Sequence, residues 1–372
     1  MFWILMLFGV LMVGIVFGAA IFPLKTRWKY LWLLPLLLTA FKYHWLLLIG
    51  QYDLPGWLLI IWSIMLEVLA FLTFWLMPGI ICLLAIDKKQ RQKWHLPVLG
   101  AALVLSIIPA AIGSWNGIKA PRIVYRTVPI AGLPKSDRVF KLAVLSDLHS
   151  DPFNDAERIS RIVAMTNAEH PDATVLLGDL VNSNPERFLG QLEPLRGLAA
   201  EYGVFMVPGN HDYYSGWENF RRQMANWRIT MLENTGRAVN TPIGKIWFAG
   251  ITDPAAMRYG LPGPDLPAAL VGNTENLPMV LLSHKPLGAY AASARGVVLQ
   301  LSGHTHGGMM PLLSALVSHG NEGFVSGFYD VNGMTLAVSN GIGIWNGFPF
   351  RIGAPPEILI LTLVPAEENA LP

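Results

Sequence analysis

The sequence predicts an α-helical membrane region followed by an α/β domain, and three observations lead to this fold class. The 372-residue chain is 53% hydrophobic and only 14% charged, which is too apolar for one soluble domain. The excess is localised, because residues 1–116 hold only 8 Lys or Arg and 3 Asp or Glu residues. Residues 117–372, with 19 basic and 22 acidic residues, alternate short apolar runs with helical patterns and are long enough to build a full core.

The first part contains four apolar runs long enough to be transmembrane helices, since about 20 residues cross a bilayer core of about 30 Å. A soluble helix bundle is the alternative, but its helices would have a polar face, and these runs have none. In the third run, Pro78-Gly79 predicts a tilt, a kink or a break. The four candidate spans are Met1–Leu24, Tyr30–Gly50, Trp57–Ile86 and Leu96–Trp115.

Basic loops predict the orientation, because Lys and Arg near the ends of spans stay on the cytoplasmic side. The loops KTRWK (25–29) and DKKQRQK (87–93) are basic, whereas QYDLP (51–55) holds no Lys or Arg. We therefore expect a multi-pass protein of the cell membrane whose first terminus and large domain lie outside the cytoplasm. No Lys or Arg precedes the first span, so we expect it to be an anchor and not a cleaved signal peptide. Three basic residues after the fourth span weaken the argument for this orientation: Lys119, Arg122 and Arg126.

Two ionisable residues, Lys42 and Glu67, fall inside the second and third spans. Such residues are costly in a bilayer unless they pair or face water. Counted from the short loop at Asp53, their depths differ by only about 4.5 Å on antiparallel helices. A structural ion pair is the simpler interpretation, and a transport pathway is the alternative. The only cysteine, Cys82, excludes an intrachain disulfide.

The second part begins with residues 117–137, a Pro- and Gly-containing stretch that we interpret as a linker with at most one edge strand. Residues 138–372 form the predicted α/β domain. Its strands are apolar throughout, which indicates burial on both faces and a layered α/β fold. The expected strands are residues 141–147, 173–179, 204–210, 245–251, 278–284 and 297–303, and the expected helices are residues 155–169, 186–201, 217–227 and 287–294.

Polar residues follow five of these strands at their carboxyl ends, where α/β sheets place their ligands. The last fragment, SGHTHGG (residues 302–308), needs a bent backbone to aim both histidines at one point, and Gly303, Gly307 and Gly308 supply that freedom. The remaining histidines of the chain receive no role. The residues expected to converge are Asp147, His149, Asp179, Asn210, His211, Asp212, His284, His304 and His306.

Imidazole and carboxylate donors without a thiolate suit Mn, Fe, Zn, Co or Ni. The donors are too numerous for one ion, so we predict two divalent metal ions that share a carboxylate. Two ions about 3.5–4 Å apart can clamp the attacking and leaving oxygens of a displacement at phosphorus and supply hydroxide near neutral pH. The fragments therefore predict metal-activated hydrolysis of a phosphate ester.

The five fragments, in this order, resemble the motifs of the calcineurin-like metallophosphoesterases. The resemblance runs from about Arg138 to Leu363 and is greatest for the branch that has a membrane-anchoring front end and a last motif GHTHGG. It implies a layered α/β sandwich with two mixed β-sheets flanked by helices. In this chain Met309 and Met310 follow that motif where relatives often have a polar residue; they either pack in the core or form a lip for acyl chains.

The resemblance also implies roles for the site residues. One ion would be held by Asp147, His149 and His306, and the other by Asn210, His284 and His304, with Asp179 bridging the two. His211 resembles a histidine that contacts the phosphate and protonates the leaving oxygen. We hypothesise that Asp212 orients the His211 ring and favours its protonated form. Three aromatic residues beside this loop, Tyr213, Tyr214 and Trp217, either shape a pocket or pack.

The membrane region favours a phosphoester, phosphodiester or pyrophosphate substrate of a lipid or an envelope glycoconjugate. The acidic balance of the second part does not favour a nucleic acid, which needs a positively charged groove. Three alternatives stay open: a nucleotide-sugar-lipid pyrophosphatase, which would act in the cytoplasm, a catalytically silent metal-binding sensor or scaffold, and a transporter-like role for the helices. The expected partners are the lipid bilayer and the phosphate-ester substrate, and the sequence leaves the oligomeric state, the native metal and the exact substrate open.

Overall fold

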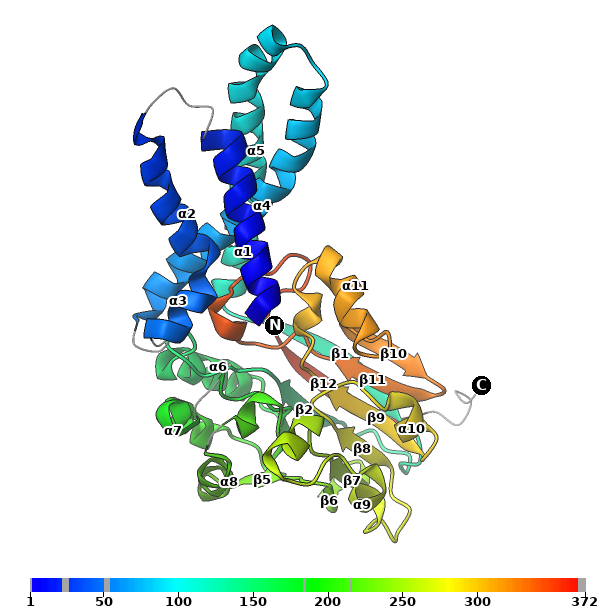
Figure 1. The fold of residues 1–372 in the computed structure, drawn as a ribbon. Coiled ribbons are helices and arrows are strands. Elements are labelled where there is room, and N and C mark those ends of the chain that lie inside the picture. Colours follow the sequence, from blue (N-terminus) through cyan, green and yellow to red (C-terminus); the bar gives the residue numbers. More distant parts are fainter. Residues whose placement is uncertain (1, 22–26, 50–53, 183–184, 215, 367–372) are drawn as a thin grey trace. The chain divides into compact units, whose positions relative to one another are not determined.

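The computed structural model describes residues 2–21, 27–49, 54–182, 185–214 and 216–366. The chain divides into two compact units (Figure 1). The first comprises Met1–Ile118 and Gly347–Arg351, and the second comprises Lys119–Asn346 and Ile352–Pro372. The boundary at residue 118 lies two residues from the one expected from the sequence, and one short segment of the expected α/β domain belongs to the first unit.

The first unit is helical. It holds α1 (Phe2–Val16), which continues as a π-helix over Phe17–Ile21, then a 3-10 turn over Arg27–Trp32. The remaining helices are α2 (Leu33–Ala40), α3 (Lys42–Ile49), α4 (Gly56–Leu84) and α5 (Lys88–Ile118). Among the described residues, α4 and α5 are long and apolar enough to cross a membrane. They correspond to the third and fourth expected spans.

Of the four expected spans, the structure describes two, the third and the fourth, as single helices long enough to cross a membrane. The second expected span is bent by 72° between Trp28–Ala40 and Lys42–Leu48, and only if this bent pair is one span does the number of candidates rise to three. In the first expected span, Met1–Leu24, the apolar helix Met6–Ala19 is too short to cross a membrane. Residues 22–24 of this span lie outside the described residues. The apolar composition shows how long each run is, but it does not predict whether a single helix continues through the whole run.

Helix α4 continues through Pro78, so the break allowed for this position does not occur. The adjacent Gly79 is required by close packing, because a Cβ atom there would lie 2.7 Å from Val98 Cγ1 of α5. Small residues commonly allow such close approach of membrane helices.

Lys42 and Glu67, the ionisable residues inside the second and third expected spans, are buried and have polar partners inside the first unit. Lys42 donates to the Ser63 hydroxyl group and to the carbonyl oxygen of Gly347, 3.4 Å away. Glu67 accepts a hydrogen bond of 2.5 Å from Ser114 Oγ. These contacts give each charge a local structural role, and an ion pair between Lys42 and Glu67 stays a prediction.

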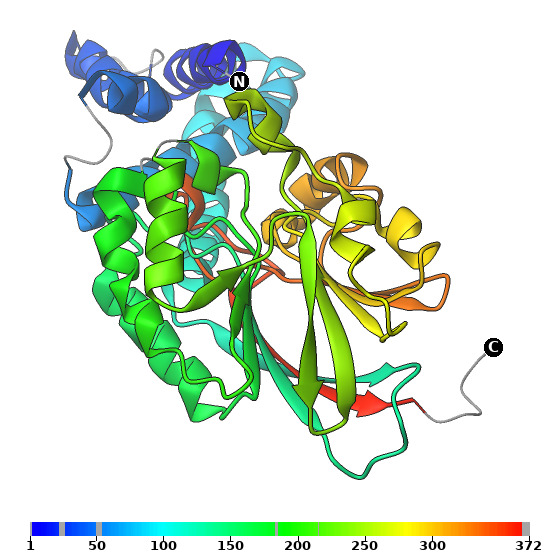
Figure 2. The same ribbon diagram turned by 90° about the horizontal axis from the view of Figure 1, so that it is seen from below.

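The second unit contains two six-stranded mixed sheets (Figures 1 and 2). The first has the order β1-β12-β2-β3-β4-β5, in which only the β12–β2 pair is antiparallel. Its strands are β1 (Arg122–Ile130), β12 (Glu357–Pro365), β2 (Phe140–Leu145), β3 (Ala173–Leu176), β4 (Val204–Met206) and β5 (Ile229–Met231). The stretch expected as a linker therefore contains an edge strand, β1.

The second sheet has the order β10-β11-β9-β8-β7-β6, with antiparallel pairs at its two edges. Its strands are β10 (Gly327–Val331), β11 (Met334–Val338), β9 (Val297–Ser302), β8 (Met279–Leu282), β7 (Gly244–Gly250) and β6 (Thr235–Thr241). The expected fold class of two mixed sheets flanked by helices is confirmed. All six strands expected from the sequence occur, as β2, β3, β4, β7, β8 and β9.

Helices cover the outer faces of the two sheets (Figure 2). The helices are α6 (Ala156–Ala168), α7 (Pro185–Phe188), α8 (Trp217–Asn226), α9 (Leu266–Leu270), α10 (Ala289–Ser293) and α11 (Pro311–His319). The helix expected over residues 186–201 is instead the short α7 followed by a 3-10 stretch, Leu189–Gly197, which contains Pro194. Proline removes a donor from the α-helical hydrogen-bond pattern, which accounts for the difference.

Successive side chains of a central strand point to opposite faces of the sheet, so they pack in different hydrophobic clusters. In β2, Leu142 and Val144 lie in the cluster between the sheets, while Ala143 and Leu145 lie in the cluster under α6 and α8. The central strands are thus buried on both faces. Their polar side chains are confined to the strand ends, which places the candidate site there.

Candidate metal centre

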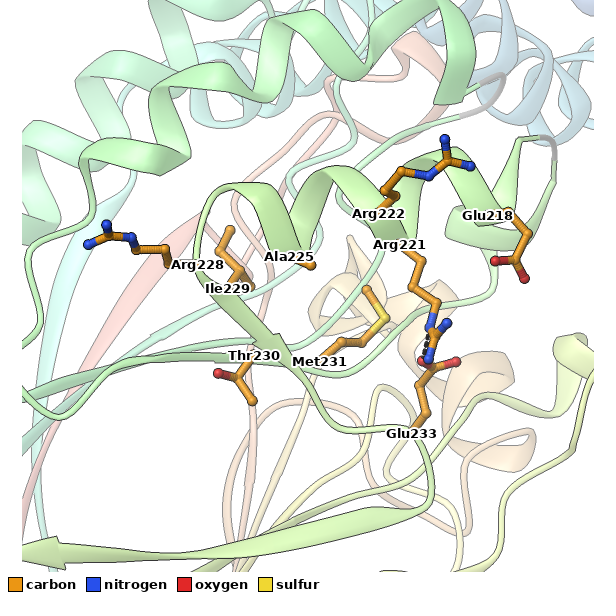
Figure 3. A pocket seen from close by; sticks show the side chains of 9 residues that line it. All are labelled: Glu218, Arg221, Arg222, Ala225, Arg228, Ile229, Thr230, Met231 and Glu233. Atoms are coloured by element: carbon orange, nitrogen blue, oxygen red, sulfur yellow. Dashed lines mark hydrogen bonds and ion pairs between the residues drawn. The ribbon is translucent and has the colours of Figure 1, made fainter.

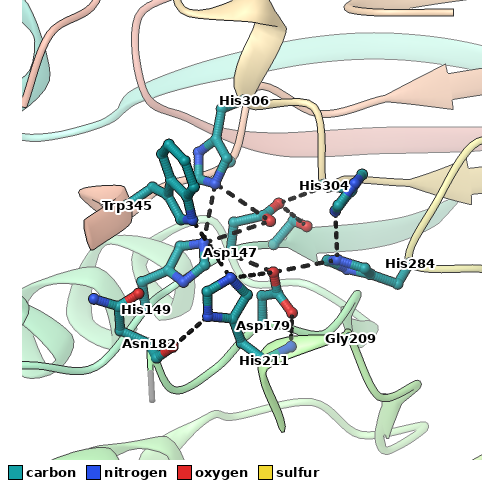
Figure 4. A network of polar contacts seen from close by, with 12 residues as sticks. Asp147, His149, Asp179, Asn182, Gly209, His211, His284, His304, His306 and Trp345 are labelled. Atoms are coloured by element: carbon teal, nitrogen blue, oxygen red, sulfur yellow. Dashed lines mark hydrogen bonds and ion pairs between the residues drawn. The ribbon is translucent and has the colours of Figure 1, made fainter. Parts of the chain in front are cut away.

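Five strand ends from the two sheets meet at one place (Figure 4). Asp147 and His149 follow β2, Asp179 follows β3, and Asn210, His211 and Asp212 follow β4. From the second sheet, His284 follows β8, and His304 and His306 follow β9. The polar side chains of both sheets therefore share one site, as the sequence predicts.

The loops that carry these side chains turn sharply through left-handed backbone conformations. Of the twelve non-glycine residues with positive φ among the described residues, five are candidate ligands. Such residues cost on the order of 1–3 kcal/mol each and persist where the surrounding structure fixes them, often at functional sites. The five are Asp147, His149, Asp179, His304 and His306, with φ values of 56°, 48°, 51°, 69° and 50°.

Asp147, His149 and His306 form the first group of candidate ligands. The distance from Asp147 Oδ1 is 3.9 Å to His149 Nε2 and 3.6 Å to His306 Nε2. The two imidazole nitrogens are 3.0 Å apart, and their rings lie nearly parallel with centroids 5.0 Å apart. One ligand atom of each residue lies within 4.8 Å of the others, so the three can surround one ion.

Asp179, His284 and His304 form the second group. His284 Nε2 lies 3.3 Å from Asp179 Oδ2 and 3.2 Å from His304 Nδ1. The other ring nitrogen of His284, Nδ1, lies 2.7 Å from the carbonyl oxygen of Leu177, which fixes the ring. Asp179 Oδ2 also lies 3.8 Å from His149 Nε2, so this carboxylate lies between the two groups.

Two buried oxygen atoms in this site fit the presence of metal ions. Asp147 Oδ1 and Asn210 Oδ1 are inaccessible to solvent and accept no hydrogen bond from the described residues. Buried acceptors without a donor are rare, and a cation satisfies them. The Asn210 amide nitrogen donates to Tyr214 Oη at 3.1 Å, which leaves its Oδ1 as the atom available to an ion. The donor set of nitrogen and oxygen atoms suits a divalent ion such as Mn, Fe or Zn.

Burial and neighbouring charges shift the pKa values of several candidate ligands. Burial raises the pKa of Asp147 to about 6. Burial also acts to raise the pKa of Asp179, but the charge on His284 holds it well below its usual range. Burial opposes protonation of His284, yet the Asp179 carboxylate raises the pKa of this imidazole to about 10. Without a cation, a proton on His284 thus balances the charge of Asp179.

Glycines allow the ligand loops to approach each other. A Cβ atom on Gly303 would lie 1.8 Å from Ser146 Oγ and 2.6 Å from Asp147 Oδ2. Gly303 is thus required by crowding, whereas Gly307 and Gly308 adopt the positive φ values of 61° and 70° that the sequence analysis expected for the glycines of this loop.

His211 projects its ring toward Asp179, with 4.0 Å between Nε2 and Asp179 Oδ2. Its Nδ1 donates to the carbonyl oxygen of Asn182, and its Nε2 accepts a hydrogen bond of 3.4 Å from Trp345 Nε1 (Figure 4). Asn182 and Trp345 were not identified from the sequence. Asn182 acts through its backbone, and Trp345 is far away in the chain, so no side-chain pattern pointed to either residue.

Asp212 does not orient the His211 ring, so this part of the hypothesis is wrong. Its carboxylate instead accepts backbone N–H groups from Asp179 at 2.9 Å, Leu180 at 2.9 Å and Gly209 at 2.8 Å. The side chain is fully buried. Asp212 therefore joins the loops after β3 and β4, and it acts on the site by holding the backbone of Asp179.

The three aromatic residues after this loop divide between the two roles left open by the sequence. Tyr213 and Trp217 are buried, and their rings are in contact at a tilt of 41° with centroids 4.4 Å apart. Tyr214 is exposed, and its ring lies against that of His211 with centroids 4.6 Å apart. Met309, beyond the last motif, is buried, in agreement with core packing, whereas Met310 is partly exposed.

The sequence of this chain is similar to those of several known proteins. The sequence model of the family described as calcineurin-like phosphoesterase matches residues 140–308, from β2 to the end of the HTHGG motif. A zebrafish (Danio rerio) protein named "Transmembrane protein with metallophosphoesterase domain" is 35% identical over 274 residues, which are 70% of this chain and 62% of that protein. An uncharacterized metallophosphoesterase of Campylobacter jejuni is 33% identical over 281 residues, which are 74% of this chain and 72% of that protein.

An uncharacterized metallophosphoesterase of Helicobacter pylori strain J99 is also similar, with 33% identity over 258 residues that cover 69% of this chain and 67% of that protein. The chain spans less than two thirds of the length of the zebrafish relative but more than two thirds of the Campylobacter relative. The matched segment contains all of the candidate metal ligands, from Asp147 to His306. The chain belongs to the calcineurin-like metallophosphoesterases, a family of metal-dependent phosphoester hydrolases.

Proposed function

We propose that the chain is a membrane-anchored phosphoesterase that uses two divalent ions to hydrolyse a phosphoester or phosphodiester bond of a lipid or envelope-linked substrate. The observation that carries the proposal is the position of Asp179, whose Oδ2 lies 3.3 Å from His284 Nε2 and 3.8 Å from His149 Nε2. One carboxylate thus adjoins both groups of ligands, and a shared carboxylate is the feature that two neighbouring ions need.

The ligand assignment follows from the two groups. Asp147, His149 and His306 would hold one ion, and His284 and His304 would hold the other together with the buried Oδ1 of Asn210. Asp179 would be the carboxylate shared by the two ions. When bound, two such ions polarise the phosphate and make hydroxide available near neutral pH. The neutral oxygen donor of Asn210 adds no negative charge to a site that must accept an anion.

His211 is the residue that we assign to the leaving oxygen. Its Nε2 faces the centre, and the Asn182 carbonyl group accepts a hydrogen bond from Nδ1 and so holds the ring. When the ring is protonated, Nε2–H can donate to the leaving oxygen as the bond from phosphorus breaks. The Trp345 N–H now at Nε2 would turn away in that form, because two donors cannot share the position.

Membrane anchoring is supported by α4 and α5 and by the name of the zebrafish relative. The sequence DKKQRQK (87–93) surrounds the start of α5, so the positive-inside rule assigns that end to the cytoplasm. The α/β unit follows the other end of α5 and would lie outside the cytoplasm. This inference needs only the orientation of α5, so it does not depend on the number of spans before it.

The substrate class follows from anchoring and charge. An anchored enzyme meets substrates in or near the bilayer, and residues 117–372 carry a slight acidic excess that does not favour a nucleic-acid backbone. A phosphate ester of a lipid or of an envelope glycoconjugate satisfies both conditions. An outside site favours such a substrate over a nucleotide-linked one made in the cytoplasm.

The test uses the full chain, purified in detergent and loaded with Mn²⁺, with bis(4-nitrophenyl) phosphate and a panel of lipid phosphates. We expect release of nitrophenolate and hydrolysis of at least one lipid phosphate, with loss of both in Asp179→Asn. Asp265→Asn is the control, because Asp265 is an exposed helix cap and Asn caps equally well. An inactive wild-type protein with a full metal complement would overturn the proposal in favour of a metal-binding scaffold.

A further inference from the structure

A cavity of about 510 Å³ adjoins the metal centre in the α/β unit. Four aromatic side chains line it, together with one basic and one acidic residue. The residues used in the argument are Tyr213, Tyr214, Trp217, Tyr259, Arg222 and Glu218. A concave site with apolar walls and few polar groups is the usual form of a site for a small organic group.

Tyr214 forms the boundary between this cavity and the metal centre. Its hydroxyl group accepts a hydrogen bond of 3.1 Å from the Asn210 amide, and its ring lies 4.6 Å from the ring of His211. Because Tyr214 also lines the cavity, one side chain contacts both the residues of the metal centre and the space of the cavity.

Two of the aromatic side chains that line the cavity are buried, and two are exposed. Tyr213 and Trp217 are 2% and 8% exposed, and Trp217 also stacks on the buried Phe220 with centroids 5.9 Å apart. In contrast, Tyr214 and Tyr259 are 40% and 47% exposed. A ring or an alkyl group that contacts these two side chains would bury apolar surface at little conformational cost.

Arg222 supplies positive charge on the rim. It also lines a second cavity of about 650 Å³ on α8, together with Arg221 and Glu233 (Figure 3). Arg221 is engaged there, since its Nε donates to Glu233 Oε2 at 2.6 Å. Arg222 makes no ion pair with the residues that the structure describes. Glu218 lies one turn earlier on α8 and also lines the cavity, but it makes no ion pair with Arg222 among the described residues. The charge of Arg222 can therefore meet an anionic group beside the aromatic side chains.

We propose that this cavity binds the organic group of the substrate, and that Arg222 selects substrates in which this group carries a second negative charge. The inference rests on the proposed function, because it takes the scissile phosphate to lie at the metal centre. The ligand class is a phosphate ester whose organic part has a ring or short apolar portion next to the phosphate and a carboxylate or second phosphate beyond it.

The test compares two esters that differ only in this charge, 4-nitrophenyl phenyl phosphate and 4-nitrophenyl 4-carboxyphenyl phosphate. In both, water adds its oxygen to phosphorus, the P–O bond to nitrophenolate breaks, and the released nitrophenolate is measured. The wild-type full chain should prefer the carboxylated ester. In Arg222→Gln, the ratio of the two kcat/KM values should fall about fivefold, as for an exposed ion pair.

Two further variants separate a binding role from a structural one. Arg221→Gln removes the same charge one residue away and should keep the wild-type ratio, because Arg221 is turned to Glu233. Tyr259→Ala should raise KM for both esters about 2- to 10-fold with little change in kcat, and Tyr259→Phe should retain the wild-type KM. Equal ratios in wild type, Arg222→Gln and Arg221→Gln, with an unchanged KM in Tyr259→Ala, would overturn the proposal.

A binding measurement distinguishes this failure from failure of the proposed function. If the wild-type protein hydrolyses neither ester, the proposed function fails, and calorimetric binding of phenyl phosphate and 4-carboxyphenyl phosphate then decides about the cavity. Tighter binding of the carboxylated compound that is lost in Arg222→Gln supports the cavity as a ligand site. Equal binding of the two compounds to wild type and Arg222→Gln contradicts it.

Discussion

Asp179 and His284 lie side by side in the metal centre, with 3.3 Å between Asp179 Oδ2 and His284 Nε2. They come from different sheets, since Asp179 follows β3 and His284 follows β8. The second oxygen of Asp179, Oδ1, accepts the backbone N–H of His211 at 2.8 Å. One oxygen of Asp179 is thus used to hold the loop after β4, and the other faces the two groups of imidazoles.

Metal binding should release a proton from His284. The Asp179 carboxylate raises the pKa of His284 to about 10, so the ring is protonated in the metal-free protein at pH 7.5, and a metal ion requires its neutral form. Metal affinity should therefore increase as pH rises toward this pKa. Calorimetric titration with Mn²⁺ in two buffers of different ionisation enthalpy measures the proton release. Identical heats in both buffers would show that His284 is already neutral.

Substitution of Asp212 should destabilise the α/β unit and weaken the metal site together. Asp212→Asn replaces one buried acceptor oxygen by a donor that faces the backbone N–H groups of Asp179 and Gly209. We expect a loss of about 2 kcal/mol in the free energy of unfolding, typical of a buried acceptor left without its partner. Tryptophan fluorescence during thermal unfolding of the full chain measures it.

The same variant also tests the role of Asp212 against the original hypothesis. A residue that oriented only the His211 ring would change catalysis and leave metal affinity unchanged. A residue that holds the Asp179 backbone should lower metal affinity as well. Wild-type thermal stability and wild-type metal content in Asp212→Asn would contradict the role that the structure gives it.

Gly303→Ala should separate the two ligand loops. The new Cβ atom would lie 1.8 Å from Ser146 Oγ and 2.6 Å from Asp147 Oδ2, so the loop after β9 must move away from β2. We expect at least a tenfold loss of metal affinity, in the range found when groups that support ligands are changed. Gly190→Ala is the matched control, because a Cβ atom there meets no atom within 4 Å. Equal metal affinities of the two variants would argue against the loop contact.

The role of His211 is tested by the leaving group of the substrate. His211→Gln should slow hydrolysis of alkyl phosphodiesters about 100-fold or more, because their leaving oxygen needs a proton. Esters of 4-nitrophenol should be affected far less, since nitrophenolate leaves without one. Rates for a series of esters with increasing leaving-group pKa give the slope for both proteins. The same slope in wild type and in His211→Gln would exclude the acid role.

Six of the eight interior strands and the ligands of the site could be predicted from the sequence, because each of these strands is a continuous apolar run that ends in a polar fragment. The interior strands β11 and β12 were not predicted. β2 and β9 show this pattern, and Asp147 and His304 follow them. The edge strands β6 and β10 were not predicted, because their side chains are partly exposed and their sequences mix polar and apolar residues. Their place in the sheet depends on pairing with β7 and β11.

Contacts made by the backbone could not be predicted in the same way. Sequence adjacency suggested that Asp212 acts on His211, yet neighbouring side chains in a 3-10 turn point in different directions, and the carbonyl group of Asn182 binds the ring. Likewise, Tyr30–Gly50 was expected as one span because it is apolar throughout, but the helix bends at Phe41. Composition contains no information on either arrangement.

The metal content of the purified, active full chain tests the account most directly. Elemental analysis should give two divalent ions per wild-type chain, and fewer than two in Asp179→Asn, because both ions depend on this carboxylate. One ion or none per active wild-type chain would contradict the shared position of Asp179 and the proposed hydrolysis with it.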